Sequence, residues 1–120
     1  MTDLKSLANE ITAFRDARDW RQFHSLRNLI VSLNLEAGEL LELTQWQRDE
    51  EIEAIPEHPQ KSEALRDECA DVLLYLLLIA DKAGFDLAEA AHAAVRLGGL
   101  RPMLVTDPGL IEAGWVAELV

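Results

Sequence analysis

The chain has 120 residues, enough for one domain with a hydrophobic core, and 49% of them are hydrophobic, which excludes wholesale disorder. Its formal net charge is −11, so binding to a nucleic-acid polymer through a basic surface is not expected. An anionic small molecule can approach such a surface when divalent cations accompany it. The plainer explanation of the charge is that it keeps the protein soluble.

The sequence shows no sign of secretion or membrane insertion. Cys69 is the single cysteine, so no internal disulfide can form and a reduced, cytoplasmic setting is expected. The first 14 residues lack the basic start and the continuous apolar run of a signal peptide. The longest apolar stretch, residues 72–80, is too short to cross a bilayer. We therefore expect a cytoplasmic protein without membrane partners.

Apolar residues recur at helical spacing through most of the chain, and no strand pattern or repeat stands out. Polar side chains that can cap a helix precede each periodic segment, and glycines follow the third and fourth segments. The expected caps are Thr2 or Asp3, Ser25, Ser62 and Asp86, and the expected stops are Gly84 and Gly98–Gly99. The expected helices cover about residues 3–17, 25–48, 62–83 and 86–97.

The segments between these helices are short and polar. Residues 18–24 are expected to form a loop with two aromatic side chains, and residues 49–62, with two prolines, a connection that has room for a short helical turn. Four helices joined in this way predict an all-α fold, a four-helix antiparallel bundle over residues 1–99. Residues 100–120, rich in glycine and proline, form an atypical tail that could hold one short helix.

The third expected helix is apolar around much of its circumference, in the stretch VLLYLLLIA. A single helix in so small a domain can hardly be covered on every side by its own chain. We therefore expect a homo-oligomer that buries part of this helix against another subunit.

Two acidic pairs lie on the second and third helices, each with a spacing of three residues, which places both members on one helix face. The pairs are Glu36 with Glu39 and Glu68 with Asp71. Glu36 falls on an apolar stripe with Leu29, Leu33 and Leu40, and Glu68 on another with Leu65 and Val72. These carboxylates should therefore point toward the interior of the bundle or its edge.

A carboxylate in such a position costs several kcal/mol unless it is compensated. It could be protonated, paired with Lys or Arg, or bound to a divalent cation, and no basic residue obviously shares the two stripes. All-oxygen ligands favour Mg²⁺ or Mn²⁺ over Zn²⁺. A di-iron bundle wants Glu-x-x-His on two helices, but Glu39 and Asp71 stand where histidine is needed. The alternative is that all these acids are solvated surface residues.

Four motifs occur in order between Trp20 and Leu87: F-H-x-x-R-N, E-x-G-E-L-x-E, Q-W and E-x-x-D-V-L-x-Y-L. In this order and spacing the chain resembles the MazG-like all-α nucleotide pyrophosphatases, and most of all their dCTP pyrophosphatase branch. The resemblance implies hydrolysis of a (deoxy)nucleoside triphosphate to the monophosphate and pyrophosphate. It also implies a homodimer or homotetramer.

The resemblance further implies a set of site residues. Mg²⁺, for which Mn²⁺ can substitute, is expected on Glu36, Glu39, Glu68 and Asp71, with Glu39 as the catalytic base. His24, Asn28 and Trp46 match positions that line a base pocket built partly by a second subunit. Each has a plainer alternative, because His24 could bridge backbone groups, Asn28 could cap a helix, and Trp46 could anchor a helix end. Trp20 is expected to pack rather than to contact the ligand, and Tyr75 to lie between the metal face and the core.

The chain departs from the family at its C-terminal end. The family's Lys and Asn, which contact the phosphates and the pocket, fall on Ala94 and Gly98 here, and Arg101 and Pro102 stand in place of its basic-Tyr-Pro ending. Arg96 or Arg101 could supply the missing cation. Otherwise the chain could be a nucleotide-binding or regulatory module with weak or no hydrolysis. A purely structural helical oligomer is the third possibility.

Overall fold

The computed structural model describes residues 3–97, and every regular element in that range is helical, which confirms the all-α prediction. The elements are α1 (Leu4–Ala17), η1 (Arg21–Phe23), α2 (Leu26–Glu42), α3 (Asp49–Glu53), η2 (Ile55–Glu57), α4 (Pro59–Ala83) and α5 (Leu87–Arg96). None of these helices is long and apolar enough to span a bilayer. The predicted stop at Gly98–Gly99 and the predicted tail, residues 100–120, lie outside the described residues.

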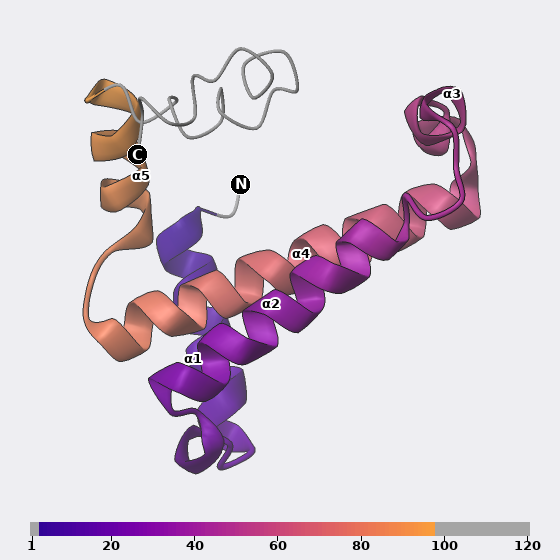
Figure 1. The fold of residues 1–120 in the computed structure, drawn as a ribbon. Helices are drawn as coiled ribbons and strands as arrows, with labels where there is room; N and C mark the ends of the chain where they lie inside the picture. The colour runs from indigo at the N-terminus through magenta and orange to yellow at the C-terminus, as the bar shows by residue number, and fades with distance from the viewer. Residues whose placement is uncertain (1–2, 98–120) are drawn as a thin grey trace. The chain divides into compact units, whose positions relative to one another are not determined.

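The chain divides into two compact units, Met1–Phe85 and Asp86–Val120. In the first unit α2 and α4 run antiparallel and make the most extensive contact between helices, and α1 crosses them and contacts α4 (Figure 1). α5 belongs to the second unit, so the four-helix bundle and its boundary at residue 99 stay predictions. The buried apolar core is small and consists of Leu29, Ile55, Leu77, Leu78 and Ala80.

Three of the predicted caps are confirmed by side-chain hydrogen bonds. The Asp3 carboxylate accepts from the Ser6 N–H at 2.7 Å, the Ser25 hydroxyl from the Asn28 N–H at 3.1 Å, and the Asp86 carboxylate from the Glu89 N–H at 3.0 Å. Each bond satisfies one of the backbone donors that a helix leaves unpaired at its start.

The predicted start of the third helix was wrong. α4 begins at Pro59, with His58 at the N-cap, and Ser62 lies inside its first turn. Proline breaks a helix interior, but at the first position its missing N–H has no partner to lose and its fixed φ suits the helix. The proline that indicated a connection in the sequence therefore starts the helix.

The predicted end of the second helix was also wrong, because α2 ends at Glu42 rather than at residue 48. The Leu43 and Thr44 N–H groups bond to the carbonyls three residues back, and the Thr44 hydroxyl donates to the Leu41 carbonyl at 2.7 Å. Trp46 then takes a left-handed conformation, with φ of 61°. These local bonds turn the chain toward α3, a short helix in the segment expected to be a connection.

Two glycines, one at the end of α4 and one inside α2, show how backbone conformation contributes to stability. Gly84 has φ of +80° at the end of α4, as predicted, and a Cβ added there meets no atom within 4 Å. Gly84→Ala should therefore destabilise the protein by about 1 kcal/mol through backbone strain alone. Gly38→Ala, inside α2 with equally free space, should stabilise it by about 0.5–1 kcal/mol. Urea unfolding measures both, and the same sign of change in the two variants would contradict the prediction.

Candidate active site

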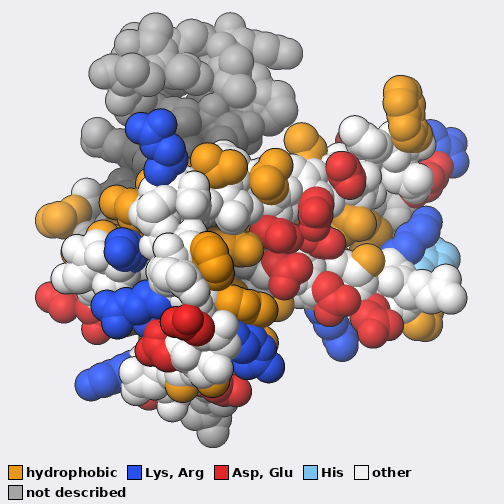
Figure 2. Space-filling model, turned by 90° about the horizontal axis from the view of Figure 1, so that it is seen from below, with side chains coloured by type: hydrophobic (Ala, Val, Ile, Leu, Met, Phe, Trp, Pro, Cys, Tyr) orange, Lys and Arg blue, Asp and Glu red, His pale blue; other side chains and the backbone are white. Residues whose placement is uncertain are grey.

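Three of the four predicted acidic residues meet between α2 and α4. Glu36 and Glu39 come from α2 and Glu68 from α4, and one carboxylate oxygen of each lies within 4.8 Å of the others. We call these three residues the acidic cluster. The antiparallel contact of α2 with α4 brings them together although they are about 30 residues apart in the chain. Figure 2 shows acidic side chains gathered between hydrophobic ones on one face of the molecule.

Two members of the acidic cluster are half-buried and lack hydrogen-bond partners on one oxygen. The Oε2 atoms of Glu36 and Glu68 are both buried and unpartnered, whereas Glu39 is exposed. Burial raises the pKa of Glu36, and the negative charge of Glu39 raises it further. Burial also raises the pKa of Glu68, and the negative charge of Glu39 again raises it further. The cluster therefore holds like charges that repel one another, two of them on half-buried side chains.

No basic side chain compensates this charge within residues 3–97. The ion pairs in that range join Arg15 to Asp16 and Asp81, and Arg48 to Glu51, none of which belongs to the acidic cluster. Of the three possibilities raised by the sequence, pairing with Lys or Arg is thus not realised here. Protonation and a bound cation remain, and a hard divalent cation suits three converging carboxylates.

Asp71, the fourth predicted acid, lies one turn further along α4. It is not part of the acidic cluster, but its charge contributes to raising the pKa of both Glu36 and Glu68. Asp71 and Glu36 also share the wall of a neighbouring cavity. Glu36 therefore belongs both to the acidic cluster and to the wall of this cavity, which Asp71 also lines.

This cavity, which we call the α1 cavity, has a volume of about 220 Å³. Most of its wall is apolar or aromatic and comes from α1, α4 and the segment between α1 and α2. The residues that line it are Ile11, Phe14, Arg15, Trp20, His24, Glu36, Asp71, Leu74, Tyr75 and Leu78. An apolar cavity with a few polar groups, beside a charged cluster, suits a ligand with a flat ring and an anionic end.

His24 lines the α1 cavity. It is half-buried, and its Nδ1 atom is buried without a hydrogen-bond partner. Burial lowers the pKa of His24, and the positive charge of Arg15 lowers it further. The imidazole is therefore neutral at pH 7 and can exchange hydrogen bonds with a ligand as donor or acceptor.

The other two predicted substrate-binding residues do not reach the α1 cavity in this chain. Asn28 is exposed, and its side-chain N–H donates to the Phe23 carbonyl at 3.1 Å, which supports the start of α2. Trp46 is 97% exposed and does not line the cavity. Trp20 packs as expected, edge-to-face on Phe14 with ring centroids 5.7 Å apart, and it also lines the cavity. Its place in a loop left no periodic signal that could have assigned it to the cavity.

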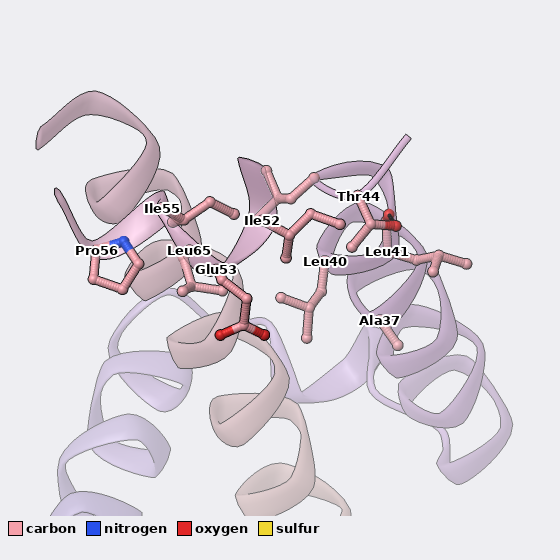
Figure 3. A pocket seen from close by; sticks show the side chains of 10 residues that line it. Ala37, Leu40, Leu41, Thr44, Ile52, Glu53, Ile55, Pro56 and Leu65 are labelled. Carbon is pink, nitrogen blue, oxygen red and sulfur yellow. Dashed lines mark hydrogen bonds between the residues drawn. The ribbon is translucent and has the colours of Figure 1, made fainter. Parts of the chain in front are cut away.

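A second cavity, of about 450 Å³, lies where α2, α3 and η2 meet (Figure 3). Its wall is almost wholly apolar and includes Leu40, Ile52, Ile55 and Leu65. Glu53 is the single acid on its wall. The larger of these two cavities therefore offers mainly apolar contacts, whereas the α1 cavity is the one next to the acidic cluster.

The raised pKa of Glu36 predicts a stability difference that depends on pH. In the folded protein its pKa lies above the ordinary value of 4.5, so the carboxylate destabilises the fold at pH above the folded pKa and not at pH below 4.5. Without metal, Glu36→Gln should therefore raise the melting temperature at pH 7 and leave it unchanged at pH 4. The matched control is Glu63→Gln, an exposed acid on α4.

With added Mg²⁺ the wild type should instead have a higher melting temperature than Glu36→Gln. At 100 times its dissociation constant a ligand stabilises the folded state by about 2.7 kcal/mol, and Glu36→Gln removes a ligand atom. Thermal melts with EDTA and with Mg²⁺ measure both effects. If Glu36→Gln melts at the same temperature as Glu63→Gln in every condition, the Glu36 carboxylate does not destabilise the fold.

Comparison with known proteins supports a single family. The sequence profile of the MazG-like family matches residues 31–97. The chain is 41% identical over 90 residues to dCTP pyrophosphatase 1 of Bos taurus and, equally, of Homo sapiens. These 90 residues are 75% of this chain but 52% and 51% of the two relatives, so the chain spans about half their length.

A solved structure gives the same result over nearly its whole length. A pyrophosphatase from Archaeoglobus fulgidus superimposes with a TM-score of 0.70 and 35% sequence identity, covering 85% of this chain and 93% of the other. The resemblance seen in the four sequence motifs is thereby confirmed. Because the family profile covers over half of the chain and the similar structure is matched almost end to end, this chain belongs to the MazG-like family.

Proposed function

We propose that the protein hydrolyses a (deoxy)nucleoside triphosphate to the monophosphate and pyrophosphate, with Mg²⁺ held by Glu36, Glu39, Glu68 and Asp71. The observation that carries the proposal is the pair of buried, unpartnered carboxylate oxygens beside a ring-sized cavity. The dCTP pyrophosphatases among the relatives support the reaction and suggest a dCTP-like substrate. A magnesium–triphosphate complex also suits a protein with a net charge of −11.

The acidic cluster fits a divalent cation because all its donors are oxygens and because two of them have no other partner. Mn²⁺ shares this preference and can substitute. When bound, the cation neutralises phosphate charge, polarises the α-phosphoryl group and lowers the pKa of the attacking water. Binding would also remove the repulsion that raises the pKa of Glu36 and Glu68.

Side chains of the protein would supply the remaining functions, which are proton transfer and binding of the base. Glu39 is the exposed member of the acidic cluster, so its carboxylate is free to take a proton from a water at the site, as a general base. His24 and the aromatic wall of the α1 cavity hold the base of the nucleotide. Asn28 and Trp46, exposed in one chain, would contact the nucleotide of another subunit in an oligomer.

A second candidate function is a nucleotide-binding or regulatory module with weak or no hydrolysis. Ala94 of α5 stands where the family resemblance leads us to expect a lysine, so one phosphate-binding cation is missing. Such a protein keeps the metal site and the base cavity but lacks part of the transition-state stabilisation.

The direct test is pyrophosphate release from a panel of deoxynucleoside triphosphates. We expect turnover of at least one of them with Mg²⁺ and none with EDTA. Removing a general base costs a factor of about 10²–10⁴, so Glu39→Gln should lower kcat by at least about 100-fold. Glu42→Gln, an exposed acid further along α2 and outside the cluster, is the control and should keep wild-type rates.

The outcomes separate the candidate functions. Full turnover by Glu39→Gln would refute the role of this residue as base. Magnesium-dependent nucleotide binding without product would favour the regulatory module. Binding of neither Mg²⁺ nor nucleotide, measured by calorimetry, would leave a structural helical oligomer.

We also propose that the protein forms a homodimer or homotetramer. Large apolar side chains on α2 are exposed, among them Leu35 at 64% and Leu41 at 66%. Residues 72–76 are consecutive on α4, so their side chains point in all directions around the helix axis, and each of them is partly exposed. So much apolar surface on a small domain favours burial against another subunit.

Light scattering coupled to gel filtration tests this assembly. We expect a mass of at least twice the 13.4 kDa of the chain. The double variant Leu35→Glu/Leu41→Glu should lower the mass, because burying a carboxylate at an apolar contact is costly. The control Asn9→Glu/Gln60→Glu adds the same charge at exposed polar positions and should not. A wild-type mass of one chain would refute the proposal.

A further inference from the structure

Arg15 is the one charged residue that is buried among those described, at 6% exposure. It lies in the last turn of α1 and lines the α1 cavity. A buried guanidinium is costly unless it is paired, so its surroundings indicate what keeps it there.

Two ion pairs hold this guanidinium in place. Its Nε–H donates to Asp16 and its Nη1–H to Asp81 of α4, both at 2.9 Å. The hydrogen bond with Asp16 is the main cause that raises the pKa of Arg15, so the side chain stays charged at any working pH. The group therefore has a fixed orientation and a permanent charge.

These two bonds leave donors unused. A guanidinium has five N–H donors and no acceptor. Among residues 3–97, its Nη2 atom has no hydrogen-bond partner. The Arg15 side chain as a whole keeps 7% of its surface accessible. Since Arg15 lines the α1 cavity, the cavity is where these donors can find an acceptor.

Arg15 and the acidic cluster lie beside different parts of α4. Arg15 bonds to Asp81, whereas Asp71 lies one turn from Glu68 of the cluster and shares the cavity wall with Glu36. Asp71 and Asp81 are ten residues apart on α4, roughly 15 Å along the axis, and Leu74, Tyr75 and Leu78 line the wall between them. A nucleotide with its phosphates at the acidic cluster would extend its base toward Arg15.

We propose that Arg15 is a specificity-determining residue, whose free N–H groups donate to a carbonyl oxygen of the nucleobase. The proposal rests on the function proposed above and narrows its substrate class. Cytosine, thymine, uracil and guanine carry a carbonyl oxygen, whereas adenine has none and presents an amino group, itself a donor. A site built to hydrogen-bond one group rejects a ligand that lacks it, because the site's own polar group is left unpaired. The protein should therefore prefer oxo-bearing nucleotides to dATP.

The experiment compares kcat and KM for dCTP, dTTP, dGTP and dATP in the wild type, Arg15→Met and Asp81→Asn. The wild type should prefer an oxo-bearing nucleotide. A hydrogen bond to a charged group corresponds to roughly 10- to 100-fold, so Arg15→Met should lower kcat/KM for that nucleotide by this factor, mainly through KM, and leave dATP nearly unchanged. Asp81→Asn weakens the link between α1 and α4 but keeps the guanidinium, so it should lower the melting temperature and preserve the preference.

Several results would overturn the proposal. One is a wild type that hydrolyses dATP as well as the others. A second is an equal loss on all four nucleotides in Arg15→Met, which indicates a structural role. A third is the same loss of preference in Asp81→Asn as in Arg15→Met. If Arg15→Met does not fold, Arg15→Lys takes its place: its ammonium still donates hydrogen bonds but lacks the planar fork that reaches Asp16, Asp81 and the base together, so this variant should lose part of the preference.

A failure of the proposed function can be distinguished from a failure of this inference. If no triphosphate is hydrolysed, calorimetry with dCMP, dTMP, dGMP and dAMP measures recognition of the base alone. Binding of an oxo-bearing monophosphate that is stronger than that of dAMP, and lost in Arg15→Met, supports the role of Arg15 without catalysis. Equal binding of all four, or no binding, overturns it.

Discussion

The repulsion among carboxylates between α2 and α4 is the constraint on which the site depends. Glu36 and Glu68 occupy positions where helix packing would otherwise place apolar side chains, and each leaves one buried oxygen without a partner. The fold tolerates this because the most extensive helix contact of the first unit surrounds the cluster. Such local destabilisation at functional groups is common, since the energy is recovered when the ligand binds.

Arg15, which lines the α1 cavity, forms a second group of charges with Asp16 and Asp81. The Arg15 guanidinium joins α1 to α4 through Asp81, and this link holds the cavity wall that α1 provides. The wall of this cavity thus carries one guanidinium, two acids and aromatic rings, which are groups that can orient a ligand with a polar ring edge and an anionic end.

The small core and the exposed apolar faces both bear on the stability of the single chain. Five apolar side chains are buried among residues 3–97, while large ones on α2 remain exposed. A domain with so few buried contacts would gain stability from association, and the exposed Trp46, beyond the end of α2, would be available to another chain in the oligomer proposed above.

Part of this protein was determined by the sequence alone, wherever the cause is local. Helical period and polar caps located α1 and α5 to within a residue or so, and the i,i+3 spacing placed Glu36 with Glu39 on one face. The left-handed Gly84 at the end of α4 also follows from local backbone sterics. The family motifs lie on α2, on α4 and in the turns beside α2, and they are local sequence patterns, so the family could be recognised from them.

The tertiary structure decided what depends on groups distant in the chain. Asp71 has the same spacing as Glu39, yet it lies outside the acidic cluster, because the register of α4 against α2 sets which oxygens converge. Trp20 reaches the α1 cavity and Trp46 does not, since the turn after Glu42 sends the latter into solvent. The burial of Arg15 depends on Asp81, 66 residues away, and no periodic pattern encodes such a pair. Local sterics fix where helices begin and end, whereas packing between helices fixes which side chains meet.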